Sequence, residues 1–371
     1  MAWLAFVLFH FACVAVAAEA MRDGPYVVQD RTGQWIALRI EGHPSAPTVR
    51  DERVSIGEQV AVAGVGAFPA FEVTLREPGS TASDTVSLRE NTPLFVVADT
   101  HGEFEITAHL LRSQRIVDDK LRWSFGTGHL VVLGDMFDRG PNHTELVWLL
   151  YKLEAEAQRA GGGVHVLVGN HETMVLLGDD RYLNPKYAIS AKAVGARHYA
   201  ALWSERTLLG QWLRSKAALM KIGDFLCAHG GVGPQFVERK LTIPAANDLV
   251  REALHARHTL PQPQSDDRAF VLGPSGPLWY RGYFLDARAQ GGAPRASAQD
   301  VTRVLDYFKA RRILVGHTKV PTITPLYEGN VIAVQVYPHR DERSGAPVME
   351  ALSIERGKLY RAKADGAREA L

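Results

Sequence analysis

The stretch that decides the fold is Leu130-Val131-Val132-Leu133-Gly134-Asp135-Met136-Phe137-Asp138-Arg139-Gly140, residues 130–140. Its apolar start is typical of a strand that is covered on both faces. The strand ends at a glycine, where the backbone can turn sharply, and two aspartates follow. Ligand sites in α/β sheets gather beyond the carboxyl ends of such strands. This stretch therefore predicts a strand of a buried parallel sheet with a ligand site at its end.

The same arrangement occurs at four more places along the chain. In each, an apolar run ends in a small residue, and a side chain that can bind a metal ion follows. The four segments are Val97-Ala98-Asp99-Thr100-His101, Val168-Gly169-Asn170-His171, Cys227-Ala228-His229 and Val315-Gly316-His317. Any one of them alone is more often a helix cap, a core histidine or a turn. Five in one chain, all at predicted strand ends, favour a metal site.

The ligand types indicate which metals fit. Aspartate, asparagine and histidine offer mixed oxygen and nitrogen ligands, which suit Mn, Fe or Zn better than Ca. Two such ions about 3.5–4 Å apart can share one carboxylate and activate a water molecule at neutral pH. We therefore expect two divalent metal ions as cofactors, and Mn, Fe and Zn all remain compatible with the sequence.

The ordered motifs resemble those of the calcineurin-like metallophosphoesterases over about residues 92–360. Asp138-Arg139-Gly140 and the single histidine of Gly316-His317-Thr318 are similar to those of the PPP-type protein phosphatases. The stretches at residues 148–154 and 279–282 look like the bacterial Shewanella-like branch. The resemblance implies an α/β fold, a sandwich of two mixed β-sheets flanked by helices, with a small N-terminal β unit before it.

The resemblance also implies a role for each site residue. The implied metal ligands are Asp99, His101, Asp135, Asn170, His229 and His317, with Asp135 shared between the two ions. His171 would be the general acid that protonates the leaving alcohol, and Asp138 would orient it. Arg139 and Arg281, together with Asn170, would bind the substrate phosphate. Arginine suits this task because it stays charged and offers paired donors.

The implied reaction is hydrolysis of a phosphomonoester by attack of a hydroxide that bridges the two metals. A phosphorylated protein is the leading substrate, and a small phosphomonoester is also compatible. One alternative is a hydrolase of nucleotides or dinucleoside polyphosphates. Another is a catalytically silent phosphate-binding protein, although capture of phosphate alone would not require the general acid His171.

Three segments are expected: a signal peptide (1–20), a small β domain (21–90) and the catalytic domain (91–371). Residues 2–18 are almost wholly apolar, and Ala18-Glu19-Ala20 is a small-x-small triplet of the kind that export peptidases cut. The apolar run is short for a membrane span of about 20 residues. We therefore expect a periplasmic or secreted protein with no stable membrane span after processing, and a retained anchor is the alternative.

Composition narrows the remaining possibilities. The net charge is +1 and no run of Lys or Arg stands out, so no nucleic-acid partner is expected. Cys227 lies in an apolar run and is expected in the core, not as a nucleophile. No proposed site residue precedes Asp99, so the small β domain is expected to be dispensable for catalysis. Four histidines in helical or polar contexts are expected to be solvent-exposed: His143, His198, His255 and His258.

Overall fold

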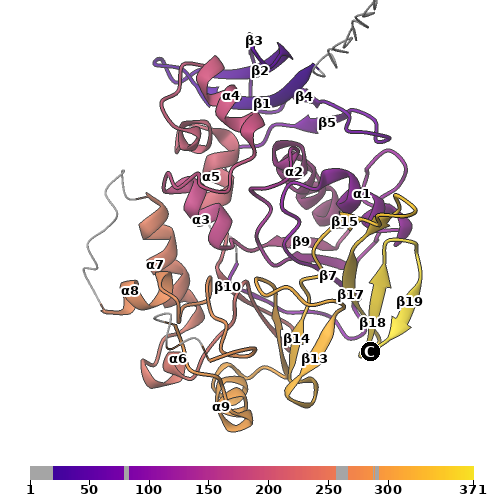
Figure 1. The fold of residues 1–371 in the computed structure, drawn as a ribbon, viewed down its shortest axis with the longest axis vertical. Coiled ribbons are helices and arrows are strands. Elements are labelled where there is room, and N and C mark those ends of the chain that lie inside the picture. Colours follow the sequence, from indigo (N-terminus) through magenta and orange to yellow (C-terminus); the bar gives the residue numbers. More distant parts are fainter. Residues whose placement is uncertain (1–19, 79–82, 256–265, 287, 289–291) are drawn as a thin grey trace, which may run out of the picture.

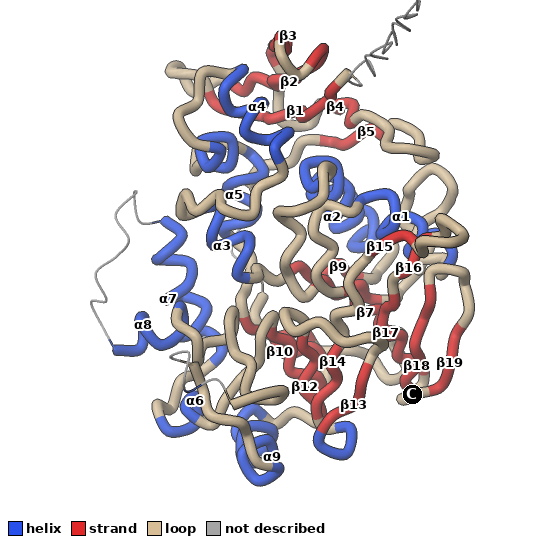
Figure 2. Tube along the Cα trace, viewed as in Figure 1, coloured by secondary structure: helices blue, strands red, loops and turns tan. Residues whose placement is uncertain are grey.

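The chain forms a mixed α/β sandwich (Figures 1 and 2), as predicted. The structure is a computed structural model that describes residues 20–78, 83–255, 266–286, 288 and 292–371. The apolar run at residues 2–18, on which the predicted signal peptide rests, lies outside these ranges. Over the described ranges, none of the helices combines the length and apolar character needed to cross a bilayer.

The first large sheet has the strand order β19-β18-β17-β7-β8-β9. Its strands are β7 (Leu94–Val97), β8 (His129–Val132), β9 (Gly163–Val166), β17 (Glu350–Glu355), β18 (Lys358–Lys363) and β19 (Arg368–Ala370). β7, β8 and β9 run parallel, and β17 pairs with β7 in the antiparallel sense. Because successive side chains of a strand point to opposite faces, β7 contributes Leu94 and Val96 to one core and Phe95 and Val97 to another.

The second large sheet has the order β13-β14-β12-β11-β10-β6. Its strands are β6 (Thr85–Val86), β10 (Leu219–Ile222), β11 (Phe225–Ala228), β12 (Arg312–Val315), β13 (Thr324–Leu326) and β14 (Val331–Ala333). Cys227, Leu314 and Ile332 pack with Leu94 and Val96 of the first sheet, which makes the core between the sheets. β6 belongs to this sheet although its residues precede the predicted domain boundary at residue 90.

Helices cover the outer faces of both sheets. The main ones are α1 (Phe104–Ser113), α2 (His143–Arg159), α3 (Asn170–Leu176), α4 (Pro185–Ala193), α5 (Leu208–Arg214), α6 (Gln235–Glu238), α7 (Ile243–His255), α8 (Asp266–Leu272) and α9 (Ala298–Phe308), with 3-10 turns η1 (Tyr199–Trp203) and η3 (Tyr327–Gly329). α2 packs against β9, and α7 packs against β10. A two-stranded pair, β15 (His339–Arg340) and β16 (Pro347–Val348), lies next to α1.

The N-terminal strands form the predicted small β unit. They are β1 (Met21–Gln29), β2 (Trp35–His43) and β3 (Ala46–Arg53), which make one antiparallel sheet, and the hairpin of β4 (Gln59–Val62) and β5 (Phe71–Thr74). Figure 1 shows β1 beside α4, and α5 also contacts β1. Tyr26 and Val27 of β1 are buried, and the Trp148 indole of α2 donates to the Pro25 carbonyl at 2.8 Å. The unit is therefore packed firmly onto the catalytic part of the chain.

Candidate metal centre and active site

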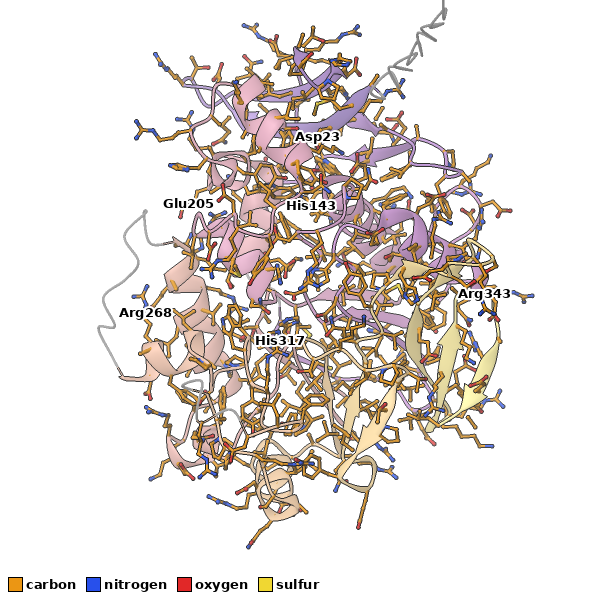
Figure 3. All side chains as sticks on the ribbon, in the orientation of Figure 1. Asp23, His143, Glu205, Arg268, His317 and Arg343 are labelled. Carbon is orange, nitrogen blue, oxygen red and sulfur yellow. The ribbon has the colours of Figure 1, made fainter. Side chains whose placement is uncertain are left out.

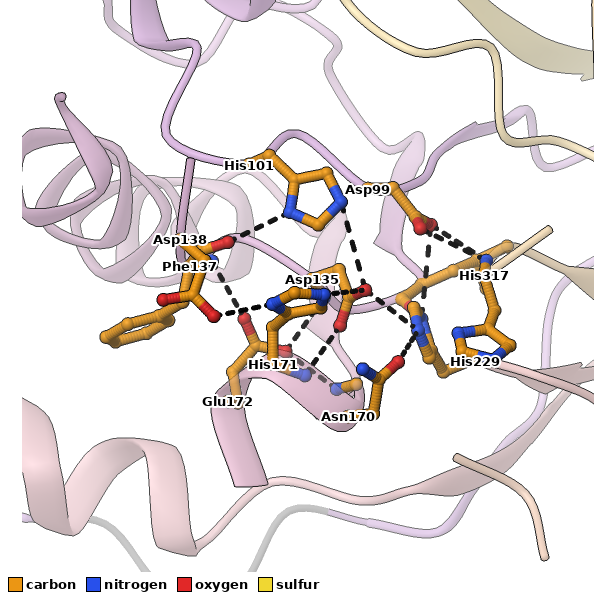
Figure 4. A network of polar contacts seen from close by, with 12 residues as sticks. Asp99, His101, Asp135, Phe137, Asp138, Asn170, His171, Glu172, His229 and His317 are labelled. Carbon is orange, nitrogen blue, oxygen red and sulfur yellow. Dashed lines mark hydrogen bonds and ion pairs between the residues drawn. The ribbon is translucent and has the colours of Figure 1, made fainter. Parts of the chain in front are cut away.

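Both large sheets deliver their strand-end residues to one place (Figure 4). Asp99 follows β7, Asp135 follows β8 and Asn170 follows β9 in the first sheet. His229 follows β11 and His317 follows β12 in the second. All six predicted metal ligands, His101 included, are buried. Figure 4 shows Asp135 between His171 on one side and His229 on the other.

The glycines before Asn170 and His317 leave no room for a side chain, because neighbouring ligands lie directly against them. A Cβ added to Gly169 would collide with the Asp135 carboxylate, and one added to Gly316 would collide with the Asp99 carboxylate. Several ligands also adopt the left-handed conformation, among them Asp99 (φ 47°) and Asp135 (φ 54°). Strained backbone of this kind clusters at functional sites, where the surrounding structure holds it in place. The motif glycines thus let carboxylates and backbone approach closely.

Two groups of potential ligand atoms share Asp135. One group is His101, Asp135 and His171, and the other is Asp135, His229 and His317. Within each group the ligand atoms lie within 4.8 Å of one another. His229 Nε2 is 3.1 Å from Asp135 Oδ2 and 2.9 Å from Asn170 Oδ1, so the amide oxygen joins the second group. A shared carboxylate between two ligand groups is what a two-metal site requires.

The orientation of the histidines also fits metal binding. His101 Nδ1 lies 2.9 Å from the Phe137 carbonyl, and His229 Nδ1 lies 2.7 Å from the Leu133 carbonyl. Metal-ligating histidines commonly donate one ring N–H to such a carbonyl and use the other nitrogen for the ion. His317 Nε2 is buried and has no hydrogen-bond partner among the described residues. The donor set is therefore suited to divalent metal ions.

The carboxylates of Asp99 and Asp135 are buried and repel each other, so positive charge beside them would stabilise their ionised forms. Burial, with added repulsion from Asp135, raises the pKa of Asp99 to about 7. Burial would lower the pKa of His229, but the carboxylates of Asp135 and Asp99 raise it to about 9. Protons on Asp99 and His229 would therefore offset the negative charge of the buried carboxylates. Divalent cations would supply the same charge and displace those protons.

His171 is held by a carboxylate. Its Nδ1 lies 2.5 Å from Asp138 Oδ2, and both side chains are buried. Burial would lower the pKa of His171, but the bond to Asp138 and the charge of Asp135 raise it overall. His171 Nε2 is 3.8 Å from Asp135 Oδ2, next to the shared carboxylate. The imidazole can therefore carry a proton beside the metal centre.

Cationic and aromatic side chains border the centre. Arg281 is half-buried and donates to Thr318 Oγ1 at 3.0 Å, beside His317. Arg139 is exposed, and its guanidinium carbon lies 5.6 Å from the centroid of the Tyr337 ring. Tyr182 is 48% exposed, and the centroid of its ring lies 5.3 Å from that of the His171 ring. An anion that reached the centre would thus meet two arginines and exposed aromatic surface.

Sequence reasoning missed Glu172. Its carboxylate is fully buried and accepts hydrogen bonds from the backbone N–H groups of Asp135, Met136, Phe137 and Gly169, at 2.6–3.1 Å. Glu172 thereby fixes the turn that carries the shared ligand Asp135. Its place directly after Asn170-His171 was the signal available in the sequence.

The expectation that His143 is solvent-exposed was wrong. Its ring is fully buried and stacks on Tyr187, with the centroids 3.6 Å apart. A polar start of a helix looks exposed in sequence, but here residues distant in the chain cover it. His198 and His255 are exposed as predicted, and His258 lies outside the described residues. Cys227 is buried in the core, as predicted.

Comparison with known proteins agrees with this geometry. The sequence model of the family described as calcineurin-like phosphoesterase matches residues 92–321, and the chain belongs to that family. Within it, the chain is similar to Shewanella-like protein phosphatases. It is 33% identical to Shewanella-like protein phosphatase 2 of Arabidopsis thaliana over 33% of this chain and 32% of that protein. It is 25% identical to Shewanella-like protein phosphatase 1 of Plasmodium berghei over 64% of each chain.

A solved structure extends the likeness to almost the whole chain. The cold-active protein-tyrosine phosphatase of a psychrophilic Shewanella species is 33% identical, with a TM-score of 0.81. The match covers 95% of this chain and 99% of that one. The fold is therefore that of a calcineurin-like phosphoesterase, and the protein is a phosphoric monoester hydrolase with clustered metal-binding residues.

Proposed function

We propose that the protein is a two-metal phosphomonoesterase that removes phosphate from proteins and accepts phosphotyrosine. The observation that carries this proposal is the His171–Asp138 pair, held at 2.5 Å beside the carboxylate that joins the two ligand groups. A site that only captured phosphate would have no use for a proton donor in this position.

Each side chain has a defined task in the proposed reaction. By the family resemblance, one ion would be held by Asp99, His101 and Asp135, and the other by Asp135, Asn170, His229 and His317. His101, His229 and His317 each group with Asp135, and Asn170 Oδ1 lies 2.9 Å from His229 Nε2. Asp99 lies in neither group of ligand atoms, but its Oδ1 accepts a hydrogen bond from the His317 N–H at 3.0 Å. The ions would supply an activated water molecule and offset the charge of the phosphoryl oxygens, and Mn, Fe and Zn all suit the ligands. His171 Nε2 would donate its proton to the leaving oxygen while Asp138 holds Nδ1. Arg139, Arg281 and Asn170 would bind the phosphoryl oxygens.

Two observations support phosphotyrosine as an accepted substrate. The Shewanella protein that matches nearly the full chain is named a protein-tyrosine phosphatase. In this chain the exposed Tyr182 ring lies beside the proposed proton donor, where it would contact the aromatic ring of a phosphotyrosine. A phosphoserine has no ring for that contact, so we expect phosphotyrosine peptides to have the lower KM.

A substrate panel tests the proposal. Peptides carrying phosphotyrosine, phosphoserine or phosphothreonine would be assayed beside ATP, a dinucleoside polyphosphate and an aryl phosphate, with Mn, Fe and Zn supplied separately. We expect metal-dependent release of phosphate from the peptides. Turnover of nucleotides alone would favour the nucleotide hydrolase. Tight phosphate binding with no turnover of any substrate would favour the silent binding protein.

A further inference from the structure

We infer that strand β1 supplies two positioning residues, Asp23 and Tyr26, which hold the loop at residues 138–141 in place through a buried polar network. The inference rests on the proposed role of Arg139 in binding phosphate, and it extends that role to the N-terminal β unit. Figure 3 labels two residues of the network, Asp23 and His143, and also His317 of the metal centre.

The loop needs support because its backbone is strained. Asp138 (φ 69°) and Arg139 (φ 62°) are consecutive residues in the left-handed region, and neither is glycine. Such conformations persist only where the surroundings determine them. The Arg139 N–H donates to the Tyr182 carbonyl at 3.0 Å, and Asn184 Nδ2 donates to the Arg139 carbonyl at 2.8 Å. The segment before α4 thus fixes the backbone on both sides of the Arg139 Cα.

The next residue of the loop is held by α4 itself. The Pro141 carbonyl accepts hydrogen bonds from Lys186 Nζ at 2.8 Å and from Tyr187 Oη at 2.7 Å. Tyr187 Oη in turn accepts from the His143 N–H at 2.8 Å, at the start of α2. The His143 ring lies flat on the Tyr187 ring, which fixes the position of the phenol. One carbonyl of the loop therefore collects two donors from one helix.

β1 completes this arrangement through the charge of Lys186. The ammonium group is largely buried and lies 3.4 Å from Glu145 Oε1 and 3.8 Å from Asp23 Oδ1. A lysine is retained in a buried position when carboxylates compensate its charge. β1 supplies one of the two carboxylates, so Asp23 helps to keep the ammonium group at the Pro141 carbonyl.

A second route runs through hydroxyl groups. Tyr26 Oη donates to Asp23 Oδ2 at 2.8 Å and lies 3.1 Å from Tyr199 Oη. Tyr199 Oη is 2.6 Å from His143 Nε2. Thr144 Oγ1 donates to Asp23 Oδ1 at 3.0 Å. Both β1 residues thus reach the start of α2, which directly follows the loop. None of these residues is a proposed metal ligand, so the network affects the phosphate-binding loop and not the metal content.

Three variants of the full-length protein test the inference: Asp23→Asn, Tyr26→Phe and Lys186→Met. The readouts are the inhibition constant of inorganic phosphate and the metal content. We expect both metal ions to remain. Phosphate should bind about five- to tenfold more weakly in Asp23→Asn and Lys186→Met, because about one hydrogen bond is lost or misdirected at the loop. Tyr26→Phe removes a single hydroxyl group and should show a smaller change in the same direction.

A matched control separates positioning from general loosening. Trp148→Phe removes the indole bond to the Pro25 carbonyl, which also joins α2 to β1, but Trp148 has no hydrogen bond to the loop. This variant should unfold at a lower temperature and bind phosphate like the wild type. If Trp148→Phe weakens phosphate binding as much as Asp23→Asn does, the inference is overturned.

A double-mutant cycle with Arg139 gives the final test. Arg139→Ala alone should weaken phosphate binding, and adding Lys186→Met should then change it by less than about twofold, because the two changes act on one contact. Independent, multiplying effects would overturn the inference. If Arg139→Ala leaves phosphate binding unchanged, the proposed role of Arg139 fails and the inference fails with it. A clear effect of Arg139→Ala without any effect of the three network variants would overturn the inference alone.

Discussion

His171 determines how the proposed reaction depends on the leaving group. His171→Asn should lower turnover by about 10²–10⁴-fold, the usual cost of losing a general acid. The loss should be largest for a phosphoserine peptide, because an alkoxide leaves poorly without a proton. It should be smaller for nitrophenyl phosphate, whose leaving group is already a stable anion. The measurement is the ratio of variant to wild-type rates on these two substrates at saturating metal.

The His171→Asn variant also distinguishes whether His171 acts as a general acid or as a metal ligand. Because His171 lies in one of the two ligand groups, it has the position of a ligand as well as of an acid. An acid can be removed without loss of metal, whereas a ligand cannot. Loss of metal from His171→Asn, or equal losses on both substrates, would contradict the role of general acid. Asp138→Asn should follow the same trend more mildly, since Asp138 acts through His171.

Asp135 is the residue on which both ligand groups depend. Asp135→Asn replaces a shared carboxylate by an amide that carries no negative charge. We expect fewer than two metal ions per chain and a loss of activity of about 10³-fold or more, since each metal contributes several kcal/mol to transition-state stabilisation. Metal analysis and turnover of an aryl phosphate would measure both effects. Full occupancy with normal turnover would show that Asp135 is not the shared ligand.

At the scale of elements, the contact among β1, α2 and α4 should make stability depend on pH. Burial, with added repulsion from Asp23, raises the pKa of Glu145 from 4.5 to about 7, although Lys186 opposes the rise. A raised pKa means that the folded protein binds this proton more tightly than the unfolded chain does. The contribution of Glu145 to stability is therefore complete below about pH 4.5 and is lost as the pH rises through 7.

Glu145→Gln should remove this dependence, because the amide stays neutral. At pH 8 we expect the variant to exceed the wild type by about 1–3 kcal/mol in free energy of unfolding, and the gap should close below about pH 5. Urea unfolding at both pH values measures it. The exposed Glu252 of α7 offers a matched control, since Glu252→Gln should stay within about 0.5 kcal/mol of the wild type throughout. A constant gap for Glu145→Gln would show that this carboxyl group does not titrate in the range.

The elements also show how far sequence reasoning reaches. β7, β8 and β12 were predicted because apolar runs of strand length stand out, and the site was predicted because ligand residues follow them. By contrast, the burial of Lys186 and His143 was not predicted. A charged or polar side chain is buried only where partners compensate it, and here those partners are distant in the chain. The role of Glu172 was not predicted for a similar reason. Its four hydrogen-bond donors are backbone groups, so only its place directly after Asn170-His171 pointed to it.

At the scale of the whole molecule, the N-terminal unit has more contact with the catalytic part than its sequence suggests. Asp23 and Tyr26 are buried against α2 and η1, and no local pattern in residues 21–90 indicates this docking. The phosphate affinities of the Asp23→Asn and Tyr26→Phe variants will therefore also test the expectation that the unit is dispensable for catalysis. The predicted boundary at residue 90 stays a prediction.

The position of β1 is compatible with removal of the predicted signal peptide. β1 starts at Met21, whose side chain is buried, so cleavage near Ala18 or Ala20 would leave the strand whole. We predict an exported protein from which the segment that ends near Ala18 or Ala20 has been removed. Mass spectrometry of the protein from its native host would identify the first residue. A chain that still begins with Met1 would favour the retained anchor instead.

The buried Cys227 sets this phosphatase apart from enzymes that attack phosphotyrosine with a thiolate. Burial raises the pKa of its thiol to about 12, and the side chain is inaccessible between the two sheets. Alkylating reagents need an exposed thiolate, so iodoacetamide should leave the rate of hydrolysis unchanged in the folded protein. The proposed hydrolysis of phosphotyrosine should then continue in the presence of thiol-specific oxidants that inactivate phosphatases with a catalytic cysteine.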